Sequence, residues 1–423
     1  MPSKGSLPFP MPLFCPCVLT VALVAASPSL AAQDGPGPDP RTACAELLRA
    51  TWTEPATRPV EHVVEAVFAA KTTGPSAGSL ASVQRALAAA DALVEFVQWT
   101  APAGERVTAF VVRPEHPVAR VELGPAAAIE QAVVAHLRLL VRWQQPLDAT
   151  SRRLGDDMAR RLRNLVLAPL EPALASCQRI WFAADGVLLP LPFEALPAAN
   201  AGTFLLEAVD VRRLHCGTDL LAETATAGRG LLVVDGGATD LPEAAREARA
   251  IAGSWDAAGR GPVQVRRASE LGELATGVRG FGYLHFATRG EFVRNGGPAP
   301  ASGRAVEATA SAHPATAIDL AACRLVVVSA GDPLDGEAVP GLAQVDFRRS
   351  LRRAGARTVV TTCWPVDDLF VREWMEQFWQ GLRTDADPAI VGRQTKLAWL
   401  ERNRRLHLDP LPGRWAAIAF EGH

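Results

Sequence analysis

The sequence lacks the features that mark several specialised classes of protein. Its 423 residues carry a formal net charge of −2, and lysine and arginine are spread along the chain, so nothing points to a nucleic-acid partner. Beyond the N-terminus, no stretch reaches the roughly 18 unbroken apolar residues of a membrane-spanning helix. There is also no sustained repeat period. With 48% apolar residues, the chain is long enough for one large domain or two smaller ones.

Cysteine is scarce and is not arranged for metal binding. None of the seven cysteines stands in a CxxC or Cys/His spacing that would hold zinc, and we expect neither a metal nor another cofactor. Cys323 and Cys363 border apolar strands and are expected to be small buried side chains. If the protein is exported, a disulfide among Cys44, Cys177 and Cys216 is an open alternative, because the sequence cannot select a pair.

The first 32 residues have the layout of a secretory signal peptide. Lys4 precedes an apolar run over residues 13–26, and small residues suited to cleavage follow up to Ala32. We therefore expect an exported, periplasmic protein. The alternatives are an uncleaved N-terminal membrane anchor, and a misassigned start, for example at Met11, which would leave the protein in the cytoplasm.

The rest of the chain has the pattern of an α/β protein. Residues 33–89 combine a Gly/Pro/Asp linker with Ala-rich helical sequence. Strands are predicted at 92–99, 106–114, 118–124, 179–184, 229–235, 282–288, 323–330 and 356–364, and helices at 126–143, 151–174 and 241–252. The last strands are near-continuous apolar runs, as in parallel strands that are covered on both faces. The pattern predicts a mostly parallel central sheet flanked by helices.

The functional site of such a sheet lies where its strands end. That geometry selects three loops, at residues 288–292, 329–336 and 364–368. In the third loop, Asp367 and Asp368 form a possible carboxylate pair for acid–base chemistry. They directly precede an amphipathic helix, however, so we expect Asp367 to cap that helix and Asp368 to interact with its dipole.

Six segments of the chain resemble the motifs of the CHAT domain family and occur in the same order. They are residues 185–196 (DGVLLPLPFEAL), 241–248 (LPEAAREA), 284–290 (LHFATRG), 325–331 (LVVVSAG), 354–368 and 415–422. The resemblance covers about residues 90–423 and implies a caspase-like fold, similar to separases and metacaspases. It implies an N-terminal strand-rich and helical subdomain over residues 90–215 and a caspase-like part over residues 216–423.

In active members of such families, a cysteine–histidine pair carries the chemistry. The family's histidine corresponds to Arg289, and its cysteine to Gly331. Arginine stays protonated and cannot act as a general base, while glycine offers no nucleophile. We therefore predict a pseudoprotease without catalytic residues that binds a peptide or protein partner. The alternatives are an active peptidase with an unrecognised nucleophile and a structural module that binds through its Ala-rich N-terminal segment.

Three nearby side chains are candidate substitutes for the missing pair. His285 lies four residues before Arg289, on the same strand face and about 13 Å away, and is expected to be a core histidine bonded to the backbone. Ser329 has no base placed beside it. Cys323 lies at the opposite end of its strand from the predicted site. Neither is expected to act as a nucleophile.

The predicted cleft is lined by Arg289, Gly290, Ser329, Gly331, Asp332 and Asp335. Asp332 and Asp335, with Glu337, make their loop either an acidic pocket for a peptide side chain or a solvated turn. Arg289 is expected to pair with Asp332 across the cleft. The alternative is that Arg289 binds a carboxylate together with backbone N–H groups near Gly331.

Overall fold

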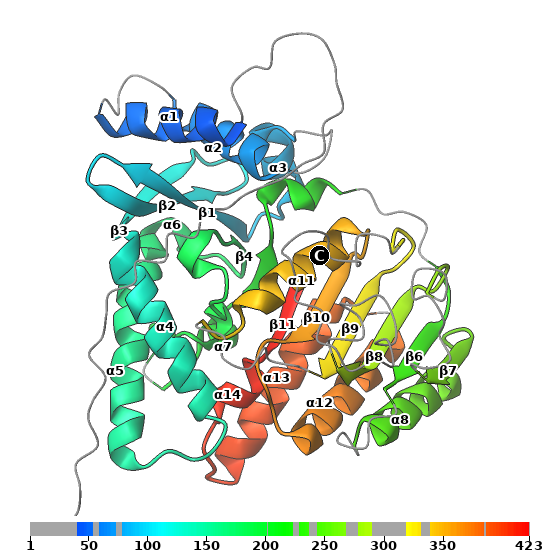
Figure 1. Cartoon of the computed structure of the whole chain (residues 1–423). Coiled ribbons are helices and arrows are strands. Elements are labelled where there is room, and N and C mark those ends of the chain that lie inside the picture. Colours follow the sequence, from blue (N-terminus) through cyan, green and yellow to red (C-terminus); the bar gives the residue numbers. More distant parts are fainter. Residues whose placement is uncertain are drawn as a thin grey trace, which may run out of the picture.

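The structure is a computed structural model of the chain (Figure 1). It describes residues 40–53, 59–72, 78–200, 202–222, 228–236, 243–267, 278–289, 319–330, 339–384 and 386–422. The predicted signal peptide therefore lies outside the described residues. The described residues form two β-sheets, and helices pack on both faces of each.

The first sheet takes its strands from residues 91–214. They are β1 (Asp91–Ala101), β2 (Gly104–Val112), β3 (Ala119–Pro125), β4 (Arg179–Ala183) and β5 (Asp210–Leu214), in the order β3-β2-β1-β4-β5. β1, β2 and β3 are antiparallel, and β4 and β5 continue the sheet parallel to β1. The strands predicted between residues 92 and 184 are confirmed, and β5 is an additional strand.

Helices cover this sheet on both faces. Val64 and Phe68 of one set of helices pack with Leu93 and Trp181 of the sheet. The helices on this face are α1 (Pro40–Thr53), α2 (Val60–Lys71) and α3 (Leu80–Ala86), and those on the other face are α4 (Ala126–Arg142) and α5 (Ala149–Val166) (Figure 1). The helix predicted at 151–174 is confirmed up to Val166, where α5 ends, because Pro169 and Pro172 lack the N–H that a continuous helix needs. The short 3₁₀ helix η1 (Ala168–Leu170) and α6 (Glu171–Leu174) follow it.

The second sheet is parallel except at one edge. Its strands are β6 (Leu231–Asp235), β7 (Val263–Arg267), β8 (Tyr283–Arg289), β9 (Leu325–Ala330), β10 (Thr358–Thr362) and β11 (Ile418–Gly422), in the order β11-β10-β9-β8-β6-β7. Only β11 runs antiparallel to its neighbour among these strands. The predicted strands at 229–235, 282–288, 323–330 and 356–364 are confirmed. β7 and β11 are additional.

The helices of the second sheet lie on opposite faces. Phe347 and Leu351 of α11 (Leu342–Arg353) bury Leu284 and Phe286 of β8. The other face is covered by α8 (Ala244–Ala257), α12 (Asp368–Gly381) and α13 (Pro388–Arg405). The apolar cluster on this face continues into the first sheet, so a single core extends through both.

The two sheets meet where β5 lies beside β11, and we call this junction the seam (Figure 1). Lys396 of α13 spans it, because its Nζ donates to Glu194 Oε1 at 3.1 Å and to the carbonyl of Ile418 at 2.6 Å. Arg212 of β5 likewise bonds both carboxylate oxygens of Asp387 at 3.1 Å. Within the described ranges, no helix is long and apolar enough to cross a membrane.

Candidate functional site

The two positions predicted to correspond to the family's catalytic pair belong to neighbouring strand ends, because Arg289 is the last residue of β8 and position 331 comes directly after β9. β8 and β9 are parallel, and the backbone of Arg289 is the register partner of Ala330, the residue just before position 331. The fold thus brings the chain at 289 and at 330 together at one strand end. Gly290, Gly331, Asp332 and Asp335 lie outside the described residues, and Arg289 is described by its backbone. The predicted contacts of these residues stay predictions.

A β-bulge interrupts β8 just before this strand end. Phe286 is paired with Val328, and Arg289 with Ala330, so three steps along β8 match two along β9. A bulge of this kind breaks the strict alternation of side chains and redirects the chain. The prediction that His285 and Arg289 share a strand face depended on unbroken alternation, so its basis is wrong.

His285 is a core residue held by two side chains. It is fully buried, and the indole N–H of Trp379 donates to its Nδ1 at 3.1 Å. Because Nδ1 accepts, the ring proton lies on Nε2, which donates to Glu247 Oε1 at 2.6 Å. The predicted core position is confirmed, but the predicted backbone partner is wrong. Both ring nitrogens are engaged, so His285 offers no lone pair for general-base chemistry.

The candidate nucleophiles are also buried and hydrogen-bonded within the core. Ser329 is buried, and its hydroxyl donates to the carbonyl of Phe286 at 3.3 Å. Cys323 lies before the start of β9, where its thiol donates to the carbonyl of Leu325, 3.2 Å from Sγ. Burial raises the pKa of Cys323 to about 12, so it stays a thiol at neutral pH. Its predicted buried role is confirmed.

Cys363 has a partner that the sequence did not reveal. It directly follows β10, at the same edge of the sheet as the ends of β8 and β9, and its buried Sγ lies 3.4 Å from Nη1 of Arg348. The same guanidinium donates to Thr361 Oγ1 at 3.0 Å and to Glu421 at 3.3 Å. The predicted burial of Cys363 is confirmed. The arginine comes from the facing helix α11, which no local sequence signal could indicate.

The other cysteines within the described residues do not form a disulfide. Cys44, Cys177 and Cys216 are each buried and free. In the part of the chain that the structure describes, no group of three His, Cys, Asp or Glu side chains is arranged to hold a metal ion.

The two aspartates of the third loop accept hydrogen bonds from backbone N–H groups at the starts of helices. Asp367 is the N-cap of α12, because its carboxylate accepts from the N–H of Phe370 at 2.9 Å, as predicted. Asp368 reaches across to α8 and accepts from the N–H of Glu243 at 3.0 Å. Burial raises the pKa of Asp368, and this hydrogen bond opposes the rise. Glu243 pairs with Arg372 at 2.8 Å, so these carboxylates join α8 to α12.

Comparison with known proteins connects this geometry to a family. The family model of the CHAT domain matches residues 156–423. The chain belongs to the CHAT domain family. No curated protein matches the sequence. Residues 40–155, which include α1 to α4 and the first three strands, thus lie before the matched CHAT domain.

One solved structure supports the same fold. A chain in the 3.0 Å crystal structure of the Saccharomyces cerevisiae separase–securin complex is similar, with a TM-score of 0.53 and 8% identity over 85% of this chain. The 2.6 Å structure of the same complex matches with a TM-score of 0.41 and 6% identity over 86% of this chain. The CHAT chain spans only 31% of the separase–securin chain in each case. The predicted caspase-like α/β fold is thereby confirmed.

Proposed function

We propose that this CHAT-domain chain binds a peptide or protein partner without cleaving it. One observation carries the proposal: arginine and glycine occupy positions 289 and 331, where the family's histidine and cysteine would stand. A catalytic pair acts as a unit, so the loss of one member already removes most of the rate enhancement. Here both members are replaced, while the surrounding motifs are retained.

The described neighbours support an inert centre. His285 is bonded at both ring nitrogens, and the thiol of Cys323 is buried, with a pKa raised to about 12. The hydroxyl of Ser329 is buried against a carbonyl. None of these described groups is positioned to replace the missing base or nucleophile.

A protein partner is the ligand class that the comparison favours. The similar yeast chain comes from a complex of separase with securin. A caspase-like scaffold that holds a peptide segment at its strand ends needs the binding groups of a protease but not its reactive ones. Arg289 supplies a permanent positive charge there, which suits an acidic segment of a partner or Asp332 of its own cleft.

One observation favours the rival, an active hydrolase. Cys363 directly follows β10 at the same sheet edge, beside the guanidinium of Arg348. Purified protein should be incubated with a fluorogenic peptide library and with thiol- and serine-reactive probes. We expect no turnover and no labelling of the native protein. Turnover that persists in Ser329→Ala/Cys323→Ala but disappears in Cys363→Ala would establish the rival, and any turnover above background would overturn the proposal.

A purely structural module that binds through its N-terminal helices is the third candidate. α1, α2 and α3 bury one face of the first sheet, so deleting residues 33–89 would expose that core. Substitutions on the outer face of these helices, such as Glu65→Lys, test this candidate without unfolding the sheet. If they abolish partner capture while Arg289→Glu leaves it intact, the binding role belongs to the helices.

Export is a further part of the proposal. It depends on the signal-peptide pattern of residues 1–32. N-terminal sequencing of the mature protein from its native host should find a chain that starts near Gln33. An intact Met1 or Met11 start would overturn export and favour a membrane anchor or a cytoplasmic protein.

A further inference from the structure

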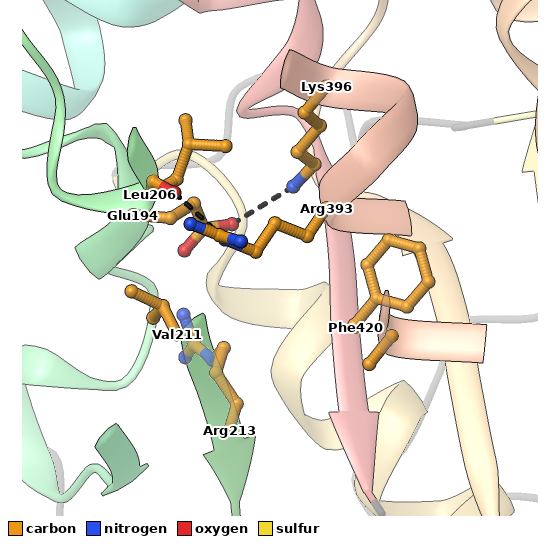
Figure 2. A pocket seen from close by; sticks show the side chains of 8 residues that line it. Glu194, Leu206, Val211, Arg213, Arg393, Lys396 and Phe420 are labelled. Atoms are coloured by element: carbon orange, nitrogen blue, oxygen red, sulfur yellow. Dashed lines mark hydrogen bonds and ion pairs between the residues drawn. The ribbon is translucent and has the colours of Figure 1, made fainter. Parts of the chain in front are cut away.

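A small cavity opens at the seam, away from the ends of β8 and β9. Its volume is about 30 Å³, which is room for roughly two water molecules or one carboxylate group. The residues that line it are Glu194, Leu206, Val211, Arg213, Ala389, Arg393, Lys396 and Phe420 (Figure 2). They come from β5, β11, α13, α7 (Leu205–Ala208) and the 3₁₀ helix η3 (Phe193–Ala195). No residue of the strand-end cleft is among them.

The charge around this cavity is unbalanced. Three basic side chains line it, and Glu194 is the only acidic one. Arg213 is buried and donates to the carbonyls of Leu189 and Leu191 instead of to a carboxylate. Burial, together with the positive charge of Arg348, lowers the pKa of Arg213. Buried positive charge that is only partly compensated makes the cavity favourable for an anionic group.

Two polar groups at the cavity have unused bonding capacity. Arg393 is half-buried, and its Nε donates to the carbonyl of Leu206 at 2.9 Å. Within the described residues, its two terminal amino groups have no hydrogen-bond partner. Glu194 Oε1 accepts from Lys396, but Oε2 is buried and has no partner among the described residues. The cavity thus presents donors suited to a carboxylate beside an acceptor that needs an N–H.

We propose that this cavity binds the C-terminal residue of a peptide. The free carboxylate would take two hydrogen bonds from the terminal amino groups of Arg393, in the bidentate geometry that guanidinium favours. The backbone N–H of the same residue would donate to Glu194 Oε2. The last side chain would pack against the apolar wall of Leu206, Val211, Ala389 and Phe420. An anion without an N–H would leave Glu194 Oε2 unsatisfied.

This second site is independent of the strand-end proposal, because the two share no residue. Failure of peptide binding here would therefore leave the question of cleavage untouched. Because the volume admits about one carboxylate group, only the carboxylate would enter the cavity, and the rest of the last residue would lie at its opening. Capture of a C-terminal carboxylate is a recurring mode of peptide recognition.

The test uses the full-length protein and N-acetylated Gly-Gly-Val, titrated by saturation-transfer NMR. We expect saturable binding of the free acid. The C-terminal amide, and the peptide whose last nitrogen is methylated, should each bind about tenfold more weakly, because each loses hydrogen bonds to a charged partner. Acetate should bind more weakly than the free-acid peptide, because it has no N–H for Glu194.

Arg393→Gln should weaken binding of the free acid by about tenfold or more and remove the preference for acid over amide. Arg405→Gln is the matched control, because this arginine lies on the same helix with a side chain 70% exposed and pairs only loosely with Glu401 at 3.9 Å. Thermal unfolding of both variants checks that the fold is intact. The proposal is overturned if the free acid shows no saturation transfer at millimolar concentration. It is also overturned if acid and amide bind equally, or if acetate binds as tightly as the peptide.

Discussion

The fold depends on the buried ion pairs of the scaffold more than on the reactive groups of the strand-end site. At the strand ends, we propose that both residues of the family's catalytic pair are replaced, and β8 and β9 pair up to Arg289 and Ala330. Elsewhere, the largely buried Lys71 pairs with the fully buried Glu95 at 2.6 Å, and Lys396 pairs with Glu194 across the seam. Reactive groups at a site can be lost without loss of the fold, whereas a buried charge needs its partner.

Removing one partner of a buried pair should have the largest effect. Lys71 Nζ also donates to the carbonyl of Phe96, and Glu95 also accepts from the N–H of Gly217. Lys71→Met leaves the fully buried Glu95 without its counter-ion and should lower the free energy of unfolding by about 3–5 kcal/mol. Urea denaturation followed by circular dichroism measures this change.

The control for Lys71→Met is an exposed pair. Arg160 and Asp157 are both more than half exposed, so Arg160→Met should change the free energy of unfolding by less than about 1 kcal/mol. If the two substitutions change the free energy of unfolding equally, the ion pair of Lys71 with Glu95 does not stabilise the packing of α2 on the sheet.

Acid should destabilise the scaffold through its buried histidines. Burial lowers the pKa of His136 to about 4 and that of His215 to about 2, below the usual value near 6.5. Between its lowered pKa and pH 6.5, each histidine is protonated in the unfolded chain but not in the folded chain. The free energy of unfolding therefore keeps its full contribution from these histidines above pH 6.5 and decreases as the pH falls below it. At pH 5, His136 alone should lower the free energy of unfolding by about 2 kcal/mol relative to pH 7.

His136→Leu tests this assignment directly. Within the described residues neither ring nitrogen of His136 has a partner, so leucine removes no hydrogen bond there. The variant should lose less stability than the native protein between pH 7 and pH 5, with the remaining loss due in part to His215. An unchanged pH dependence in urea denaturation would contradict the lowered pKa of His136.

The Trp379–His285–Glu247 chain connects the scaffold to the strand that leads to the site. Trp379→Phe removes the donor to His285 Nδ1 and leaves a buried acceptor unsatisfied. Trp374→Phe is a matched control on the same helix, because its buried indole N–H has no partner among the described residues. Trp379→Phe should cost about 1–2 kcal/mol more than the control in thermal or urea unfolding. Equal costs would show that only indole packing matters.

The sequence predicted the apolar strands of the second sheet well, and it missed two polar strands, β5 of the first sheet and β7 of the second. β8, β9 and β10 are buried on both faces, so their composition alone identifies them. β5 reads Asp-Val-Arg-Arg-Leu, and its burial depends on Asp387 and on the carbonyls of Leu189 and Leu191, which are distant in sequence. β7 is an edge strand with exposed polar residues, which also lacks an apolar run.

Contacts between residues that are distant in sequence also limit what could be predicted about the candidate site. The motifs predict a site at positions 289 and 331, because a resemblance suggests the location of a site along with the fold. They could not identify the partners of His285, since Glu247 and Trp379 lie 38 and 94 residues away in the chain. The bulge before Arg289 was equally hidden, because register depends on the neighbouring strand.

Restoring the family's residues should have the smallest effect, and it tests whether the strand-end cleft still has the shape of a protease. Arg289→His with Gly331→Cys reinstates a base and a nucleophile on chain positions that the pairing of Arg289 with Ala330 brings together. We expect weak cleavage in a fluorogenic peptide assay from the double variant. Neither single variant should cleave, because each lacks one member of the pair. We expect the free energy of unfolding in urea to stay within about 1 kcal/mol of that of the native protein. A double variant that is folded but inactive would mean that the cleft itself, and not only its reactive pair, has diverged from a protease.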